Sequence, residues 1–203
     1  MNRVVAGGGF EFFADYYLSA LPFERVQRII PALNVDLTGF EHSPITGIHL
    51  WFDRPITDLP HATLLDRTIQ WMFNKGEGKA IQLVVSASRS LIEMTRAEVI
   101  DLAVRELSEF FPEAAKAHLE KAHVVKEVRA TFSAKPGLES KRPSAVSPIP
   151  NLFLAGDWTR SGWPATMEGA VRSGYLAAEA VTVATGVPRR FLIPDIEIGR
   201  AHV

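Results

Sequence analysis

Hydrophobic and polar residues alternate along much of the middle of the chain, a pattern typical of strands that bury one face. In the clearest case, Ile48, Leu50 and Phe52 fall on the same side of one predicted strand. The predicted strands lie at 43–53, at 68–88 as a pair joined by a turn around Gly76–Gly78, and at 122–134. Residues 40–135 are therefore predicted to form a strand-rich region.

A helical period interrupts this alternation over residues 95–111. Thr95 and Glu98 have the spacing of a capping box, in which each residue satisfies a backbone amide of the other. The apolar residues that follow recur on one helical face: Val99, Leu102, Ala103, Leu107 and Phe110. Pro112 then predicts the start of a further short helix, because proline is favoured in a first helical turn.

The beginning of the chain predicts three short elements. Residues 4–13 read as a hairpin whose turn is the run Gly7–Gly9, and residues 15–20 read as a further strand. Residues 22–31 begin and end with proline and predict a short helix between them.

The predicted elements give a mixed α/β fold built from two interleaved regions. Residues 1–35 and 150–185 form one region, which the strand-rich region 40–135 divides in sequence. The segment 136–149 is rich in proline and serine and predicts a linker loop. The tail, 186–203, lacks clear periodicity.

The composition of the chain excludes several classes of function but does not identify one. The chain has 203 residues and a formal net charge of -1, so no global field favours nucleic acid. It has no cysteine, which excludes disulfides, thiolate metal sites and a cysteine nucleophile. There is no apolar run of about 18 residues and no signal-peptide pattern, so we expect a cytoplasmic protein.

Histidines and serines give no recognisable catalytic or metal-binding motif. His118 and His123 are five residues apart, off the i, i+4 spacing that places two ligands on one helical face, so no metal site is predicted. No serine has the G-x-S-x-G surroundings of a hydrolase nucleophile.

The most informative stretch is NLFLAGDWTRSGWPATMEGAVRSGYLAAEA, residues 151–180. It predicts a short buried strand, then Gly156 and Asp157 at its carboxyl end, then a helix from about 164–166. Ligands bind at that end of a strand in open α/β sheets, and the first amides of a helix suit an anion or a carbonyl group. Asp157 could accept hydrogen bonds from sugar hydroxyls.

The helix of this stretch carries two ridges of small residues, each at a spacing of four. Ala170, Gly174 and Ala178 form one ridge, and Gly169, Ser173 and Ala177 form the other. An interior glycine costs a helix about 1 kcal/mol relative to alanine, so something must approach the helix closely. The ridges fit contact with a cofactor, and they fit equally well ordinary tight packing of helix on sheet.

The segments LFLAGDWT and GWPATMEGAVRSGYLAAEAV closely resemble the C-terminal flavin-contacting motif of the FAD-dependent amine oxidase and phytoene desaturase superfamily. The details are more similar to the desaturase side. The segments FEHSPITGIHLWFDRPIT and QWMFNKG resemble the squalene-associated branch, the hydroxysqualene dehydroxylases. The resemblance implies the C-terminal part of a Rossmann-like FAD-binding domain with the strand-rich region inserted as a substrate domain.

The resemblance also implies roles for residues of the motif. Asp157 would contact the ribityl–pyrophosphate part of FAD, and backbone amides near Thr166 and Met167 would face the pyrimidine edge of the flavin. Small residues would permit close approach of the cofactor: Gly156, Gly169 and Ala170. Glu168 would turn away from the cofactor. No catalytic acid or base is named by the motif.

Four further side chains lie near the motif and carry open alternatives. Trp158 and Trp163 could line a flavin or substrate cavity, or pack in the core or at the surface. Arg160 and Arg172 could help to neutralise cofactor phosphates.

The superfamily's other signature, G-x-G-x-x-G between a strand and a helix, is absent from these 203 residues. Gly7–Gly9 has the wrong spacing and fits a hairpin turn. We therefore expect a fragment that is inactive and binds FAD weakly by itself. Either a companion chain carries the missing N-terminal βαβ unit, or the reading frame is truncated. The apolar edge of the strand at 151–155 would then lack a neighbour.

The implied activity is reduction of hydroxysqualene to squalene in hopanoid biosynthesis, with an isoprenoid lipid as substrate. A carotenoid desaturase or amine oxidase-like enzyme is the first alternative, and a non-catalytic, partner-binding remnant is the second. The basic residues Lys135, Lys141 and Arg142 fit a solvated loop or a contact with the inner-membrane surface.

Overall fold

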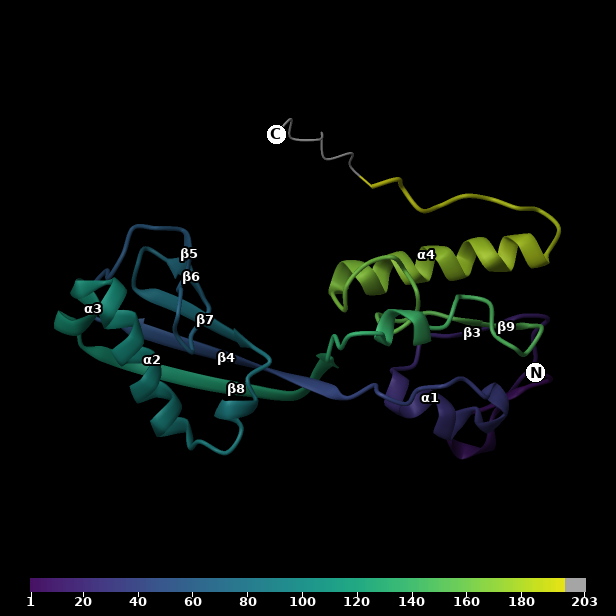
Figure 1. The fold of residues 1–203 in the computed structure, drawn as a ribbon, viewed down its shortest axis with the longest axis horizontal. Helices are drawn as coiled ribbons and strands as arrows, with labels where there is room; N and C mark the ends of the chain where they lie inside the picture. The colour runs from purple at the N-terminus through teal and green to yellow at the C-terminus, as the bar shows by residue number, and fades with distance from the viewer. Residues whose placement is uncertain (196–203) are drawn as a thin grey trace. The chain divides into compact units, whose positions relative to one another are not determined.

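The computed structural model describes residues 1–195 and divides the chain into two compact units. Unit 1 consists of Met1–Phe40 together with the chain from Ala134 onward, and unit 2 is Glu41–Ser133. Figure 1 shows both units. The segment 136–149, predicted as a linker, belongs to unit 1 and contains a short 3-10 helix at Leu138–Lys141. Part of the predicted tail, 196–203, lies outside the described residues.

Unit 2 is built on a five-stranded antiparallel sheet with the strand order β5-β6-β7-β4-β8. Its strands are β4 (His42–Phe52), β5 (His61–Thr63), β6 (Trp71–Gly76), β7 (Ala80–Ser86) and β8 (Leu119–Phe132). The predicted strands and the turn between β6 and β7 are confirmed. The three-residue edge strand β5 was not predicted, because it is too short to show alternation.

The buried face of this sheet is covered by helix α2 (Arg96–Phe110), with the short helix α3 (Pro112–Lys116) after it. The predicted capping box of α2 is confirmed, since the Thr95 hydroxyl accepts the Glu98 amide and the Glu98 carboxylate accepts the Thr95 amide. One continuous apolar core joins sheet and helix; its central members include Ile48, Leu50, Met72, Leu83, Val99, Ala103 and Leu107.

Unit 1 begins with the predicted glycine-turn hairpin, in which β1 (Val4–Val5) pairs with β2 (Glu11–Phe12). A second, parallel pair joins β3 (Tyr17–Ser19) to β9 (Leu152–Leu154). Helix α1 (Phe23–Ile29) follows β3, as the two flanking prolines predict.

The expectation that β9 has an unpaired edge is wrong. On the side away from β3, the Leu154 amide donates to the Ala145 carbonyl at 2.8 Å, and Phe153 forms an antiparallel bridge with Val146. The proline- and serine-rich segment therefore folds back and protects this edge. Among the described residues, no strand pairs with the second edge of β3.

Helix α4 (Met167–Ala184) lies along β9 (Figure 1). Burial shows which of its two small-residue ridges packs there. Gly169, Ser173 and Ala177 are buried, whereas Ala170, Gly174 and Ala178 are only half-buried. A Cβ added at Gly174 would meet no atom of the described residues within 4 Å. Tight packing within the chain thus explains the first ridge and leaves the second ridge open. No helix in residues 1–195 has the length and apolarity needed to span a membrane.

Candidate functional site

The loop between β9 and α4 begins at Gly156, where the backbone conformation and the neighbouring atoms exclude other residues. Gly156 has a φ of 135°, and a Cβ there would lie 2.5 Å from Nε1 of Trp158. Its amide donates to the Ser173 hydroxyl at 2.8 Å, which ties the loop to the buried ridge of α4. The backbone therefore turns sharply directly after the strand, and only glycine fits this position without strain.

Trp158 is a core residue. Its side chain is fully buried, and its indole N–H donates to the Leu21 carbonyl at 2.9 Å. A buried tryptophan needs such a partner for its only donor. Of the alternatives that the sequence left open for this residue, the core position is the one observed.

Arg142 organises the rest of the loop, although the sequence placed it in a basic cluster open to solvent or membrane. It is only 3 % exposed, and that expectation is wrong for this residue. Its guanidinium donates to the backbone carbonyls of Asp157, Thr159 and Trp163 at 2.5–2.9 Å. Three carbonyls on one buried cation fix the course of the loop. No sequence signal separates Arg142 from Lys141, which lies exposed and pairs with Asp36.

The amino end of α4 is capped from within the chain. Thr166 is the N-cap residue, and its hydroxyl accepts the amide of Gly169 at 3.0 Å. A Cβ at Gly169 would collide with the Pro164 carbonyl oxygen, so this glycine is needed for the turn into the helix. Ala170 donates its amide to the Thr166 carbonyl and begins the regular helical bonding.

Two backbone donors at this end of α4 remain for a ligand. Within residues 1–195, the Met167 and Glu168 amides have no hydrogen-bond acceptor, and the Met167 residue is 89 % exposed. The positive end of the helix dipole lies at the same place. The helix end can therefore receive a carbonyl or an anion. Contacts of Asp157, Thr166 and Ala170 with a cofactor stay predictions.

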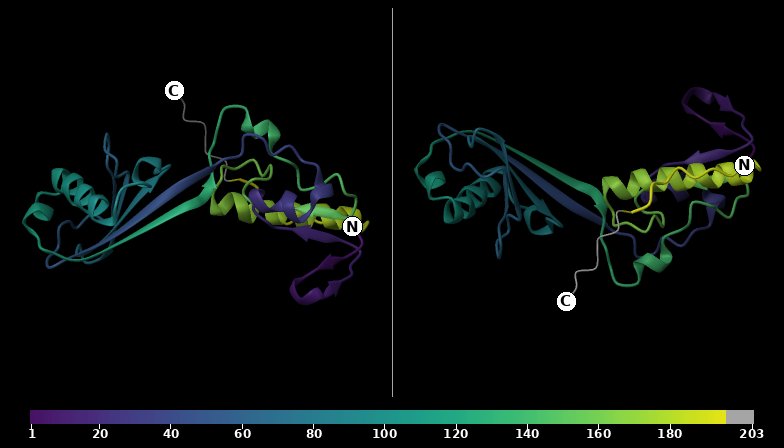
Figure 2. Two further views of the ribbon diagram at one scale, coloured as in Figure 1. Left: turned by 90° about the horizontal axis from the view of Figure 1, so that it is seen from below. Right: turned by 90° about the horizontal axis from the view of Figure 1, so that it is seen from above.

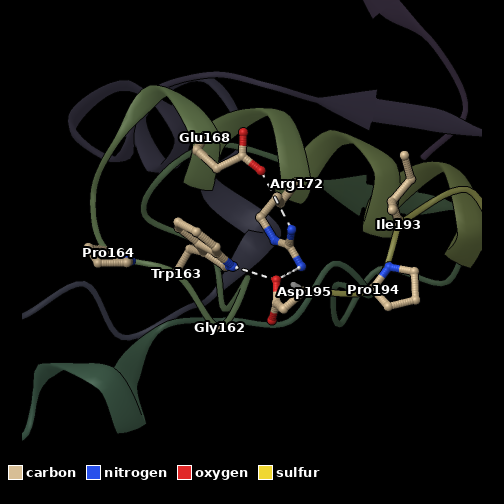
Figure 3. A pocket seen from close by; sticks show the side chains of 8 residues that line it. All are labelled: Gly162, Trp163, Pro164, Glu168, Arg172, Ile193, Pro194 and Asp195. Atoms are coloured by element: carbon tan, nitrogen blue, oxygen red, sulfur yellow. Dashed lines mark hydrogen bonds and ion pairs between the residues drawn. The ribbon is translucent and has the colours of Figure 1, made fainter. Parts of the chain in front are cut away.

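A cavity of about 780 Å³ opens beside the amino end of α4 (Figure 3). Its lining residues are Gly162, Trp163, Pro164, Glu168, Arg172, Ile193, Pro194 and Asp195. The Arg172 guanidinium lies over the Trp163 ring, 5.1 Å from its centroid, and pairs with the Asp195 carboxylate at 2.8 Å. Glu168, expected to turn away from the cofactor, lines this cavity and lies 3.5 Å from Arg172.

A second candidate surface is the face of the unit 2 sheet opposite the apolar core. Strand register places His123 beside His49, and Val84 beside Trp71. The rings of His49 and Trp51 stack at 6.2 Å, and those of Trp71 and Phe73 at 6.3 Å. Lysine side chains lie over two of these rings: Lys121 over Trp51 and Lys75 over Phe73. On this aromatic face His49, Trp51 and Phe73 are half-buried and Trp71 is exposed, which suits contact with a large apolar molecule.

The described residues hold no group of three or more potential metal ligands, and His202 lies outside them. Arg160 donates to the Ser140 carbonyl at 3.3 Å, so its guanidinium supports the loop on the side of Leu138–Lys141.

Comparison with known proteins gives the class of fold and site. The chain belongs to the family described as flavin containing amine oxidoreductase, whose model matches residues 1–182. This membership confirms the resemblance inferred from the motif, and it confirms a flavin, FAD, as the cofactor.

The relatives refine this class. A 15-cis-phytoene desaturase of Synechococcus elongatus is 30 % identical over 188 residues, 83 % of this chain and 40 % of the relative. A hydroxysqualene dehydroxylase of Sinorhizobium fredii is 33 % identical over 165 residues, 81 % of this chain and 38 % of the relative. The chain thus spans about 40 % of the length of the relatives that it matches.

Solved structures show the same fold. Reduced UDP-galactopyranose mutase matches with a TM-score of 0.61 at 13 % identity, covering 91 % of this chain and 44 % of that chain. Cyclohexylamine oxidase from Brevibacterium oxydans matches with a TM-score of 0.54 at 14 % identity, covering 91 % and 46 %. The predicted mixed α/β fold, part of a Rossmann-like flavoprotein, is confirmed.

The residues present fit a flavin at the amino end of α4. The exposed amides of Met167 and Glu168 can donate to an electron-rich ring edge, which would stabilise negative charge on the reduced ring. The orphan Nε of Arg172, buried and without an acceptor among residues 1–195, lies in the same neighbourhood and suits a phosphate.

Proposed function

We propose that this chain forms the C-terminal, flavin-contacting part of an FAD-dependent oxidoreductase that acts on an isoprenoid lipid. The observation that supports it most directly is the amino end of α4, where two backbone amides lack acceptors within the described residues. In this role the chain's backbone positions the flavin, and the flavin when bound supplies the redox chemistry.

The favoured reaction is reduction of hydroxysqualene to squalene. It is supported by the 33 % identical dehydroxylase and by the sequence around β4 and β6. Such a reaction delivers a hydride to carbon, while the hydroxyl group leaves with a proton as water. The aromatic face of unit 2 is the part of this chain that would contact the hydrocarbon.

Desaturation of a carotenoid precursor is the second candidate, since phytoene desaturases match over a similar share of the chain. The direction of electron flow separates the two reactions. A dehydroxylase consumes reduced flavin, whereas a desaturase removes hydrogen from its substrate and leaves the flavin reduced.

The function is tested by joining the chain to the N-terminal part of the Sinorhizobium dehydroxylase that precedes the matched region. We expect a flavin-bound protein that converts hydroxysqualene to squalene when a reductant is supplied. Formation of a conjugated polyene from phytoene would favour the desaturase instead. A flavin-bound protein that transforms neither substrate would contradict an isoprenoid lipid substrate.

The flavin contact has a sharper test at Met167, the first residue of α4. Met167→Pro removes the backbone donor but keeps the helix, because proline is tolerated at this position and Thr166 is already extended. We expect about fivefold weaker flavin binding in the joined protein, as one hydrogen bond contributes about 1 kcal/mol. Met167→Ala keeps the amide and serves as the matched control; equal affinities for the two variants would contradict the contact.

The prediction that this chain needs a companion chain to bind FAD is tested with two separate polypeptides. The 203-residue chain should show little flavin absorbance after purification, and co-expression with a dinucleotide-binding segment should restore it. A stoichiometric yellow complex of the chain alone would contradict the need for a partner. Cytoplasmic location and contact with the inner membrane stay predictions.

A further inference from the structure

The chain does not leave unit 1 after α4 but runs back along it. We call the segment Val187–Asp195 the strap. Figure 1 and the right view of Figure 2 show the strap following α4 from its carboxyl end toward its amino end. The strap contacts Thr182, then Glu179, then Arg172. These positions are three and seven residues apart, so they lie on one stripe of the helix.

Polar contacts hold the strap along most of its length. The Arg189 amide donates to the Thr182 hydroxyl at 3.0 Å, and the Phe191 and Leu192 amides both donate to one Glu179 oxygen at 2.7 Å. Apolar burial is partial: Val187, Phe191 and Ile193 are 41–79 % exposed, and Leu192 is half-buried. Lifting the strap would uncover little apolar surface, so it can open at small cost.

The last contact of the strap is made by a carboxylate. Asp195 Oδ1 lies 2.8 Å from the Arg172 guanidinium and accepts the Trp163 indole N–H at 3.2 Å (Figure 3). The Arg172 side chain is 11 % exposed and lies over the Trp163 ring. Its Nε is buried and lacks an acceptor among residues 1–195. A guanidinium with an adjacent indole donor is a general receptor for an anionic oxygen.

We propose that Arg172 and Trp163 form a binding site for a phosphate group, which Asp195 occupies as a tethered competitor. The strap then lies on α4 when Asp195 is bound to Arg172, and its end lifts from this contact when an external phosphate replaces the carboxylate. Glu168 lies 3.5 Å from the same guanidinium and sets the charge balance of the site. With Asp195 released, Arg172 faces one carboxylate instead of two and attracts an anion more strongly.

The cavity is large enough for more than a carboxylate. With the strap in place its volume is about 780 Å³, in the range of small-molecule pockets, and the walls outside the strap include the Trp163 ring and Pro164. A phosphate could come from a nucleotide such as the flavin cofactor or from free phosphate. The proposed phosphate site is independent of the proposed lipid substrate and of the redox reaction.

The test is a titration of the 203-residue chain with inorganic pyrophosphate, followed by the ¹⁵N–¹H signal of the Trp163 indole. Asp195→Asn removes the competing charge, and we expect pyrophosphate to bind about fivefold more tightly to this variant than to the unaltered chain. Asp101→Asn, an exposed carboxylate on α2 without a recorded partner among the described residues, is the matched control and should change nothing. Equal affinities for all three proteins would overturn the proposal.

Two further measurements test which side chain binds the phosphate and whether a nucleotide supplies it. Arg172→Met should abolish the response of the Trp163 signal, and Glu168→Gln should strengthen pyrophosphate binding less than Asp195→Asn does. Repeating the titration with ADP and with FAD shows whether a nucleotide phosphate binds more tightly than pyrophosphate. A Trp163 signal that still responds in Arg172→Met would overturn the proposed receptor. None of these readouts depends on activity, so their failure leaves the proposed oxidoreductase function standing.

Discussion

The two units of this chain are stabilised in different ways. Unit 2 has a continuous apolar core between its sheet and α2, with Leu50, Leu83 and Leu107 fully buried. Unit 1 has shorter strands, and buried polar side chains hold its loops: Arg142 binds three carbonyls, and Ser173 binds the Gly156 amide. Non-directional packing thus supports both units, and in unit 1 directional hydrogen bonds also set the course of the loops.

This difference bears on function. The proposed cofactor contacts lie in unit 1, where polar anchors hold a loop and a helix end in one position. A ligand-binding backbone needs that precision, because a donor displaced by 1 Å loses most of its hydrogen bond. The proposed substrate surface lies on the sheet of unit 2, where an apolar partner needs area more than exact direction.

The largest effect is expected in the core of unit 2. Leu83→Ala removes a fully buried side chain from the middle of β7 and should lower the free energy of unfolding by about 2–5 kcal/mol. Urea denaturation with hydrogen exchange of the β4 and β7 amides measures this loss. Val84→Ala, on the half-buried face of the same strand, is the control and should cost clearly less. Equal losses would contradict the assignment of the core face.

In unit 1 the corresponding change is Arg142→Met, which keeps much of the side chain's bulk but removes its donors. The carbonyls of Asp157, Thr159 and Trp163 would lose their buried cation. We expect a loss of about 2–4 kcal/mol, since each unsatisfied buried carbonyl costs about 1–3 kcal/mol and water can reach some of them. Amide exchange over residues 156–166 measures it. Lys141→Met, its exposed neighbour, should have little effect; the reverse ranking would contradict the role of Arg142.

The same contrast explains how much of the structure could be predicted. The strands and helix of unit 2 could be read from periodicity, because a half-buried strand or helix repeats its apolar residues at fixed spacing. The capping box at Thr95 was predictable for a similar reason, since both partners lie within one turn. Strand β5 escaped because His61–Thr63 has too few residues to show a period.

Unit 1 was predictable only where its contacts are local. The hairpin at Gly7–Gly9 follows from turn chemistry, and the helix predicted to start at about 164–166 begins at Met167, after the N-cap Thr166. Long-range anchors leave no such pattern: nothing in a proline- and serine-rich segment indicates that Arg142 reaches Trp163, 21 positions later. The closure of the β9 edge by Val146 and the cavity beside Asp195 depend on the same kind of contact.

A smaller loss of stability is expected at the N-cap residues, Thr95 of α2 in unit 2 and Thr166 of α4 in unit 1. Thr95→Ala removes half of a complete capping box and should destabilise unit 2 by about 1 kcal/mol. Thr166→Ala removes a hydroxyl that accepts the Gly169 amide and donates to the Pro164 carbonyl, and we expect a loss of similar or smaller size, seen as faster exchange in the first turn of α4. Thr→Ser at each position keeps the hydroxyl and is the control. A larger loss at Thr166 than at Thr95 would show that unit 1 depends more strongly on its caps.

The smallest effect concerns the strap and depends on pH. The Glu179 carboxylate accepts the Leu192 and Phe191 amides, and these hydrogen bonds hold its pKa below the ordinary value, with a weaker contribution from Arg190. Because the pKa is lowered in the folded chain, the attachment is complete above the pKa of a free glutamate, roughly 4.3. It weakens as the pH falls through the lower folded value, where the carboxylate is protonated.

This pH dependence should appear as reduced protection from exchange and shifted signals of the Phe191 and Leu192 amides as the pH falls through the lowered pKa of Glu179. Amides in the middle of α2, which lie outside the strap, should keep the same protection over that range and serve as the internal reference. Glu179→Gln removes the titrating group, so in this variant the strap amides should respond no more than the reference does. If the signals of the two strap amides in the unaltered chain did not follow the titration of the Glu179 carboxylate, Glu179 would not be an anchor of the strap. Something other than the hydrogen bonds to Glu179 would then hold the strap on α4.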